Sequence, residues 1–182
     1  MSKFLDIDGL EYYTKQFKPG LAELVDGGMK NFIHNQLISG TTPYGNINYI
    51  VNSDGSISIS EQTAGSSNAD IVIPFTVDIT GEYMFIGGIN GGSGTTYKSQ
   101  IALYPDMTNV QELFSDTNVL VTLEKDVSYA YRIRIYANKT IPACTVYPMV
   151  CSKAAWTISH SYQPYNKIIA TQDEILDVFR QN

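Results

Sequence analysis

Hydrophobic and polar positions follow two different periods along this chain, and the change falls near residue 40. From residue 41 onward, short segments alternate in period two or form compact apolar runs, as strands do. We predict strands at 47–51, 56–60, 71–77, 81–89, 99–104, 118–124, 129–137 and 143–150. Turn signals but no helical segments separate them, which favours a mainly β fold: an antiparallel β-sandwich, jelly-roll-like, with short helices at both ends.

Three signals inside this region are more specific. Asp54-Gly55 between the first two strands indicates a hairpin. Pro74 cannot donate a ladder hydrogen bond, which predicts an edge, a bend or a bulge. The segment 129–137 alternates most clearly. One of its faces carries Tyr129, Tyr131, Ile133 and Ile135, and the other carries Arg132, Arg134 and Tyr136.

The first 40 residues have helical periodicity instead. Apolar residues recur at spacings of three to four at Leu10, Tyr13, Phe17, Leu21, Leu24 and Val25. We predict a short helix at 8–17 and a second from Pro19. Their apolar stripe must be covered, either by the strand domain or by other copies of the chain, and both alternatives remain open. Thr171 and Glu174 have capping-box spacing and predict a C-terminal helix.

The sequence therefore divides into a helical leader at 1–40, a sandwich domain at 41–168 and a C-terminal helix at 169–182.

The net charge of −6 and the scarcity of clustered Lys and Arg argue against binding of nucleic acid. No apolar run is long enough to span a membrane or to serve as a signal peptide, so we expect a soluble chain made in the cytoplasm. Cys144 and Cys151 are seven positions apart, and we interpret both as thiols in a reducing compartment.

No catalytic constellation emerges from the titratable residues. Neither His34 nor His160 has a nucleophile in a recognisable motif, and the acids, Asp70 among them, fall mostly at turns and helix starts. The NSDGS turn lacks the remaining ligands of a calcium loop, and GGINGGSGTTY at 87–97 lacks a phosphate-loop ending, so it is interpreted as a flexible loop. We therefore assign no catalytic residue, no metal and no cofactor.

Aromatic residues are the remaining candidates for ligand binding. Sugars stack on exposed aromatic rings, and Tyr97, Tyr104 and Trp156 lie at expected loops or strand ends. A lone tryptophan near a chain end more often packs against the hydrophobic core than binds a ligand. The competing interpretation is therefore that Trp156 packs against the core.

The order of several segments resembles a sandwich domain of phage and prophage tail or minor structural proteins. The matching elements are Gly45 to Ile59, Tyr131 to Ile135, Tyr147-Pro148-Met149, and Tyr162 to Tyr165. The N-terminal stretch FLDIDGLEYYTKQFKPGLAELVD looks like the helical leader of such proteins. The resemblance covers about 80% of the chain.

The resemblance implies a non-enzymatic virion protein, associated with the tail, that presents a β-sandwich for attachment to a host surface. Its expected partners are copies of itself through residues 1–40, with a trimer as the natural arrangement, other tail proteins, and a cell-surface glycan. The alternative is a carbohydrate-binding module of an adhesion or glycan-degrading system.

Overall fold

The computed structural model describes residues 31–33, 39–115, 117–158 and 160–162, and this part of the chain is mainly β. The strands are β1 (Gly40–Thr41), β2 (Asn48–Val51), β3 (Ile57–Ile59), β4 (Gln62–Thr63), β5 (Ala69–Phe75), β6 (Gly81–Ile86), β7 (Tyr97–Leu103), β8 (Asn109–Leu113), β9 (Asn118–Leu123), β10 (Tyr129–Ile135), β11 (Thr140–Ile141), β12 (Cys144–Val146) and β13 (Met149–Ser152). One helix, α3 (Lys153–Ile158), follows β13. The helices predicted at 8–17, from residue 19 and at 169–182 lie outside the described residues.

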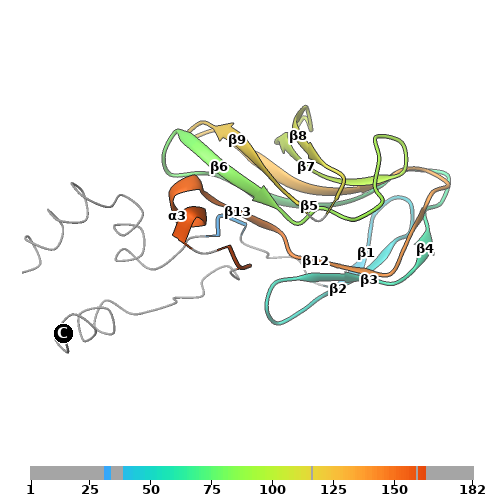
Figure 1. The fold of residues 1–182 in the computed structure, drawn as a ribbon. Coiled ribbons are helices and arrows are strands. Elements are labelled where there is room, and N and C mark those ends of the chain that lie inside the picture. The colour runs from blue at the N-terminus through green and yellow to red at the C-terminus, as the bar shows by residue number, and fades with distance from the viewer. Residues whose placement is uncertain (1–30, 34–38, 116, 159, 163–182) are drawn as a thin grey trace, which may run out of the picture.

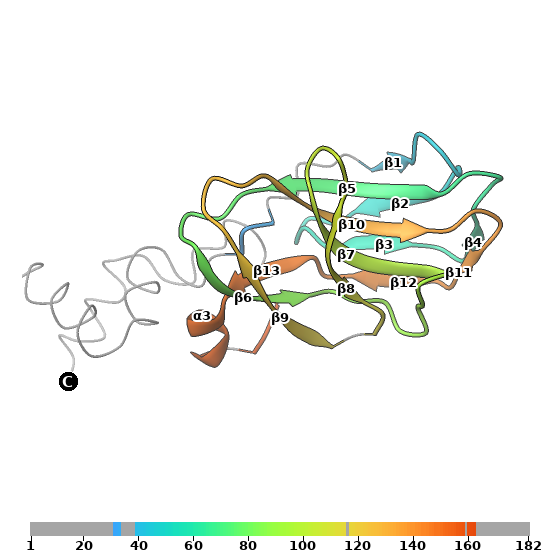
Figure 2. The ribbon, with the colours of Figure 1, turned by 90° about the horizontal axis from the view of Figure 1, so that it is seen from above.

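The strands form antiparallel sheets that lie in two layers (Figure 1). One sheet has the order β5-β10-β7-β8, and it lies over a sheet with the order β1-β2-β3-β12. Seen from above, β5, β10 and β7 lie over β2, β3 and β12 and run in roughly the same direction (Figure 2). A three-stranded sheet, β13-β6-β9, and a two-stranded ribbon, β11-β4, complete the arrangement.

The segment predicted as one strand at 143–150 is two strands. β12 pairs with β3, whereas β13 pairs with β6, and the change of partner falls at Tyr147-Pro148. Proline has no N–H to donate, so the ladder is interrupted there. The single chain segment thereby links two of the sheets.

The other seven predicted strands are found, with boundaries shifted by a few residues. Pro74 lies on β5, an edge strand, and Asp54-Gly55 turns the β2–β3 hairpin with Gly55 at φ 81°. The sequence analysis missed four of the described strands: the two-residue strands β1, β4 and β11, and the longer β8, which pairs with β7 through a bulge. The strand β8 is the longest of the four. Its sequence NVQEL has no clean alternation, because only Leu113 among its residues is buried.

The hydrophobic core lies between the layers. Of the two faces predicted for β10, the one that carries Tyr129, Tyr131, Ile133 and Ile135 is at most 4% exposed and points inward. These residues pack in one cluster with Ile57 and Ile59 of β3 from the other layer. Fully burying each isoleucine contributes roughly 1.5–3 kcal/mol, so this cluster is the main source of stability.

Residues 31–33, which the sequence analysis assigned to the leader, belong to this core. Ile33 is 1% exposed, and the Asn31 side chain donates to the Pro148 carbonyl at 3.1 Å and accepts from the Val150 N–H at 3.2 Å. The Phe32 N–H also donates to the Val150 carbonyl at 2.8 Å. The predicted leader boundary at residue 40 therefore lies beyond a segment that is tied to β13.

The glycine-rich loop between β6 and β7 is closely packed rather than loosely attached. A Cβ on Gly88 would lie 1.8 Å from the Ser115 carbonyl oxygen, and one on Gly87 would lie 2.5 Å from that of Tyr147. The Gly87 carbonyl accepts from the Tyr131 hydroxyl at 2.6 Å. These glycines permit a close approach of backbone to backbone.

Candidate functional site

The structure does not bring the three predicted sugar-stacking residues together. Tyr97 is 8% exposed, and its hydroxyl donates to the Asn90 carbonyl at 3.1 Å. Tyr104 is 41% exposed and follows the other end of β7, about 23 Å away at ~3.3 Å per residue. Trp156 lies on α3, half-buried. The three rings therefore offer no shared stacking platform.

Trp156 packs against hydrophobic core residues, as the interpretation that competed with sugar stacking expected. It covers a small second core formed by Met84, Met149, Cys151 and Ala155. Its ring also stacks on His160, with centroids 5.0 Å apart and planes inclined by 30°. Both cysteines are thiols, and Cys151 is buried in this small core.

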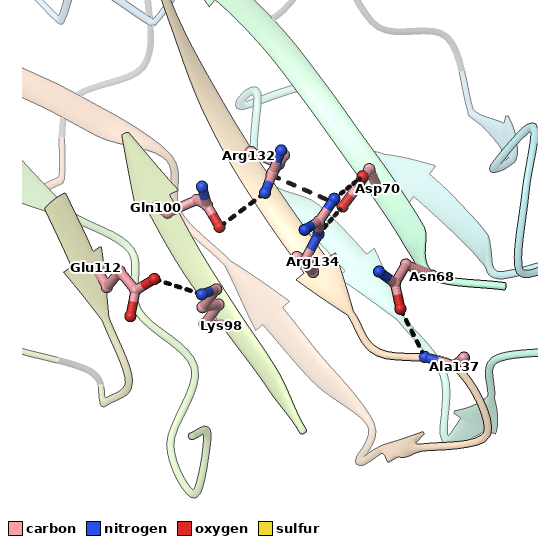
Figure 3. A network of polar contacts seen from close by, with 8 residues as sticks. All are labelled: Asn68, Asp70, Lys98, Gln100, Glu112, Arg132, Arg134 and Ala137. Carbon is pink, nitrogen blue, oxygen red and sulfur yellow. Dashed lines mark hydrogen bonds and ion pairs between the residues drawn. The ribbon is translucent and has the colours of Figure 1, made fainter. Parts of the chain in front are cut away.

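A different set of residues is concentrated on the outer side of the β5-β10-β7-β8 sheet (Figure 3). Strand alternation that sends the tyrosines and isoleucines of β10 into the core turns its arginines outward. Register then aligns these arginines with polar residues of the neighbouring strands. We call this set the charged face: Asp70, Lys98, Gln100, Glu112, Arg132 and Arg134.

Most of the charged face is internally paired. Arg134 donates from Nε and Nη2 to the two carboxylate oxygens of Asp70, each at 2.8 Å. This bidentate geometry is among the stronger protein hydrogen-bond arrangements. On the next strands, the Lys98 ammonium donates to the Glu112 carboxylate. These pairs fix four side chains at defined positions across four strands (Figure 3).

Arg132 is the exception within the network. Its Nη2 donates to Gln100 Oε1 at 3.1 Å, but its Nε is buried without a hydrogen-bond partner. The nearest carboxylate oxygen, Oδ1 of Asp70, lies 3.7 Å from that Nε, which is an ion pair but too long for a hydrogen bond. A buried donor without an acceptor is costly, so Arg132 has unused capacity to bind an acceptor.

The charged face is more enclosed than an outward sheet surface ordinarily is. Lys98 is 6% exposed, Gln100 1% and Arg132 4%. Two small residues on the same side, Ala102 and Ala130, are fully buried. The long side chains lie across the strands toward one another, as Figure 3 shows.

The charges of this face differ in sign from the chain as a whole. Three cations oppose two carboxylates, which leaves one net positive charge in a chain of net charge −6. Burial tends to lower the pKa of Lys98, but hydrogen bonds to Glu112 and Tyr136 outweigh it and raise that pKa. The hydrogen bond to Asp70 raises the pKa of Arg134, whereas burial lowers that of Arg132. Arg132 is thus the least compensated cation of the face.

Sequence reasoning found part of this site. The alternation in 129–137 placed Arg132 and Arg134 on one face, opposite the face that carries the tyrosines and isoleucines. It placed Asp70 at a turn or helix start, which is wrong, because Asp70 lies within β5 opposite Arg134. Lys98, Gln100 and Glu112 were missed, since no local motif indicates which residues of distant strands will be aligned.

The described part of the chain holds no group of three or more His, Cys, Asp or Glu side chains placed to bind a metal ion. None of its helices has the length and hydrophobicity that a membrane-spanning helix requires. His34 lies outside the described residues, and His160 contacts Trp156 as noted above.

No protein-family model matches the sequence, and no curated protein matches it. Among solved structures, the chain is similar to a cycloisomaltooligosaccharide glucanotransferase of Paenibacillus sp., complexed with cycloisomaltoheptaose. The similarity covers 69% of this chain but only 19% of that protein, at 13% sequence identity and a TM-score of 0.33. A likeness at this level carries no argument about function.

Proposed function

We propose that this chain is a non-enzymatic virion or prophage tail protein whose β-sandwich binds a cell-surface glycan on the charged face. The strand order supports a jelly-roll-like sandwich, because strands far apart in sequence are neighbours in each sheet: β10 lies between β5 and β7, β12 beside β3, and β6 between β13 and β9. In this arrangement β5-β10-β7-β8 forms one layer. The β1-β2-β3-β12 and β13-β6-β9 sheets, joined through the β12–β13 segment, form the other.

The observation that carries the proposal is Arg132, 4% exposed, with a buried Nε that lacks a hydrogen-bond partner. A guanidinium group binds carboxylates in a planar, bidentate geometry, and its binding is strongest where water is excluded. The surplus positive charge of the face adds to this preference. An acidic saccharide has a carboxylate that can pair with the guanidinium group. Its hydroxyl groups can form further hydrogen bonds with the polar side chains of the face.

The setting on a virion rests on the order of sequence segments that resembles tail proteins. In that setting the leader attaches the chain to its own copies or to other tail proteins, and the sandwich presents its binding face outward. Multiple copies raise a weak single-site affinity by roughly 10²–10⁴ when the sites engage together. The alternative, a carbohydrate-binding module of an adhesion or glycan-degrading system, uses the same face without such an assembly. Light scattering on the full chain tests the attachment to its own copies, since an oligomer supports the first function and is not required by the alternative.

The binding proposal is tested by calorimetric titration of the full chain with uronic-acid and sialic-acid oligosaccharides. Replacing Arg132→Gln removes the charge and shortens the side chain, and we expect at least a tenfold loss of affinity, which is about 1.4 kcal/mol. Lys153→Gln is the matched control, because Lys153 forms an exposed ion pair with Glu82 at 2.7 Å beside α3, away from the charged face. Equal affinities of Arg132→Gln and the unmodified chain, with both folded by circular dichroism, would contradict the proposal.

A further inference from the structure

A second surface lies on the other layer, on the outer side of the β1-β2-β3-β12 sheet. It is a shallow groove with a volume of about 630 Å³. That volume falls within the ~300–1,000 Å³ range of small-molecule sites. We call it the uncharged groove, lined by Asn48, Tyr49, Ile50, Ser58, Ile59, Ser60, Ala143, Cys144 and Thr145. None of these residues is Asp, Glu, Lys, Arg or His.

Register explains how the polar residues of the groove come to share one side. Ser58 on β3 lies opposite Ile50 of β2 and opposite Thr145 of β12, so these three side chains form a row across the sheet. Ile50 is 60% exposed, which leaves an aliphatic surface beside two hydroxyl groups.

The hydroxyl and amide groups here are held in place by each other. The Ser58 and Thr145 hydroxyls lie 3.3 Å apart, and the Asn52 amide donates to Ser58 Oγ at 2.9 Å. The Gln62 amide donates to Ser60 Oγ at 3.2 Å and to the Asn48 carbonyl at 2.6 Å. Groups that are already fixed lose little conformational entropy when they bind a ligand.

We propose that the uncharged groove binds a neutral saccharide, at a site separate from the charged face. A sugar ring has an apolar C–H side, which fits the aliphatic surface of Ile50. Its hydroxyl groups both donate and accept, as the Ser and Thr hydroxyls and the Asn side chain of the groove do. Because no charged side chain lines the groove, binding a neutral ligand leaves no ion desolvated without a partner.

Charge complementarity separates this site from the first. The charged face has one net positive charge and an incompletely bonded guanidinium group, so it favours an anion. The uncharged groove offers an anion no cation with which to pair. The two faces therefore predict two ligand classes for one domain, and this inference stands whether or not the charged face binds an acidic glycan.

The test is a titration of the ¹⁵N-labelled full chain with neutral hexose and N-acetylhexosamine oligosaccharides, followed by amide chemical shifts. We expect the shifts to be confined to residues 48–50, 58–60 and 143–145. Ser58→Arg should fill the groove and weaken binding at least tenfold. Ser66→Arg is the matched control, because Ser66 is exposed and does not line the groove.

Two further variants keep the outcomes distinct. Ser58→Ala removes the hydroxyl group without adding bulk, so it tests whether a loss of affinity in Ser58→Arg comes from misfolding. It should weaken binding by less than Ser58→Arg does. Arg132→Gln should leave binding of the neutral sugars unchanged. The inference is overturned if neutral sugars shift amides of the charged face instead, or if they shift none. It is also overturned if Ser58→Arg changes only the mass of the protein in solution, which would make the groove a contact between copies. Acidic oligosaccharides, measured in parallel, report on the charged face alone.

Discussion

The outer faces of the two layers are built by the same strand alternation, yet they differ in chemistry. On β5-β10-β7-β8 the outward positions hold five charged side chains that neutralise one another in pairs, apart from Arg132. On β1-β2-β3-β12 the groove is lined by hydroxyl, amide and aliphatic groups without a charge. Buried charges depend on their partners much more than hydroxyl groups do. We therefore expect the first face to be sensitive to single substitutions and the second to be tolerant.

The largest expected effect comes from removing the carboxylate that serves both arginines. Asp70→Ala leaves Arg134 without its bidentate partner and Arg132 without its nearest anion. Breaking a fully buried pair costs about 3–5 kcal/mol, and because the Asp70 side chain is 28% exposed we expect a loss of about 2 kcal/mol.

Urea unfolding of the full chain measures this loss. Glu61→Ala is the control, because it removes an exposed carboxylate between β3 and β4 and should change stability by no more than ~0.5 kcal/mol. If Asp70→Ala were as stable as Glu61→Ala, the pairing of the charged face would contribute nothing and the contrast between the faces would fail.

A smaller effect is expected in the uncharged groove. Thr145→Val keeps the branched shape that suits a strand and removes only an exposed hydroxyl group, 3.3 Å from that of Ser58. We expect the free energy of unfolding to change by no more than ~0.5 kcal/mol. A loss above ~1 kcal/mol in the same urea experiment would show that the hydroxyl network contributes as strongly as a buried hydrogen bond.

The smallest effect concerns the hairpin turn that joins β2 and β3. The Asp54 carboxylate accepts from Ser56 Oγ at 2.6 Å and from the Ser56 N–H at 2.9 Å, and these bonds lower the pKa of Asp54 from its ordinary 3.8. Since the folded pKa is depressed, the stabilisation is present above the unfolded pKa and is lost as the pH falls through the folded pKa.

Asp54→Asn should therefore lower the Tm slightly near neutral pH, and the difference should vanish well below pH 3.8. Thermal unfolding followed by circular dichroism across this range measures it. A Tm difference that does not depend on pH would show that the charge of Asp54 is irrelevant to the turn.

Parts of the fold were predictable because the signals are local. Alternation in 129–137 identified both faces of β10, and Asp54-Gly55 identified the hairpin. β8 was not predictable, because it is an edge strand with a bulge and buries only Leu113, so its sequence lacks a period. The break at Tyr147-Pro148 was predictable only in part. Proline indicates an interruption of the strand ladder, but it does not show that the residues on its two sides pair with different strands.

The sequence by itself determined that the chain is mainly β, that the tyrosines and isoleucines of β10 are buried, and that Arg132 and Arg134 point away from them. These features depend only on the two-residue period of a strand and on the cost of burying or exposing each side chain. Tertiary structure alone decided that Asp70 meets Arg134, that Glu112 meets Lys98, and that Ile50, Ser58 and Thr145 share one groove. Those contacts are set by strand order and register, which join residues as many as 87 positions apart, and no local pattern encodes which distant strand becomes the neighbour.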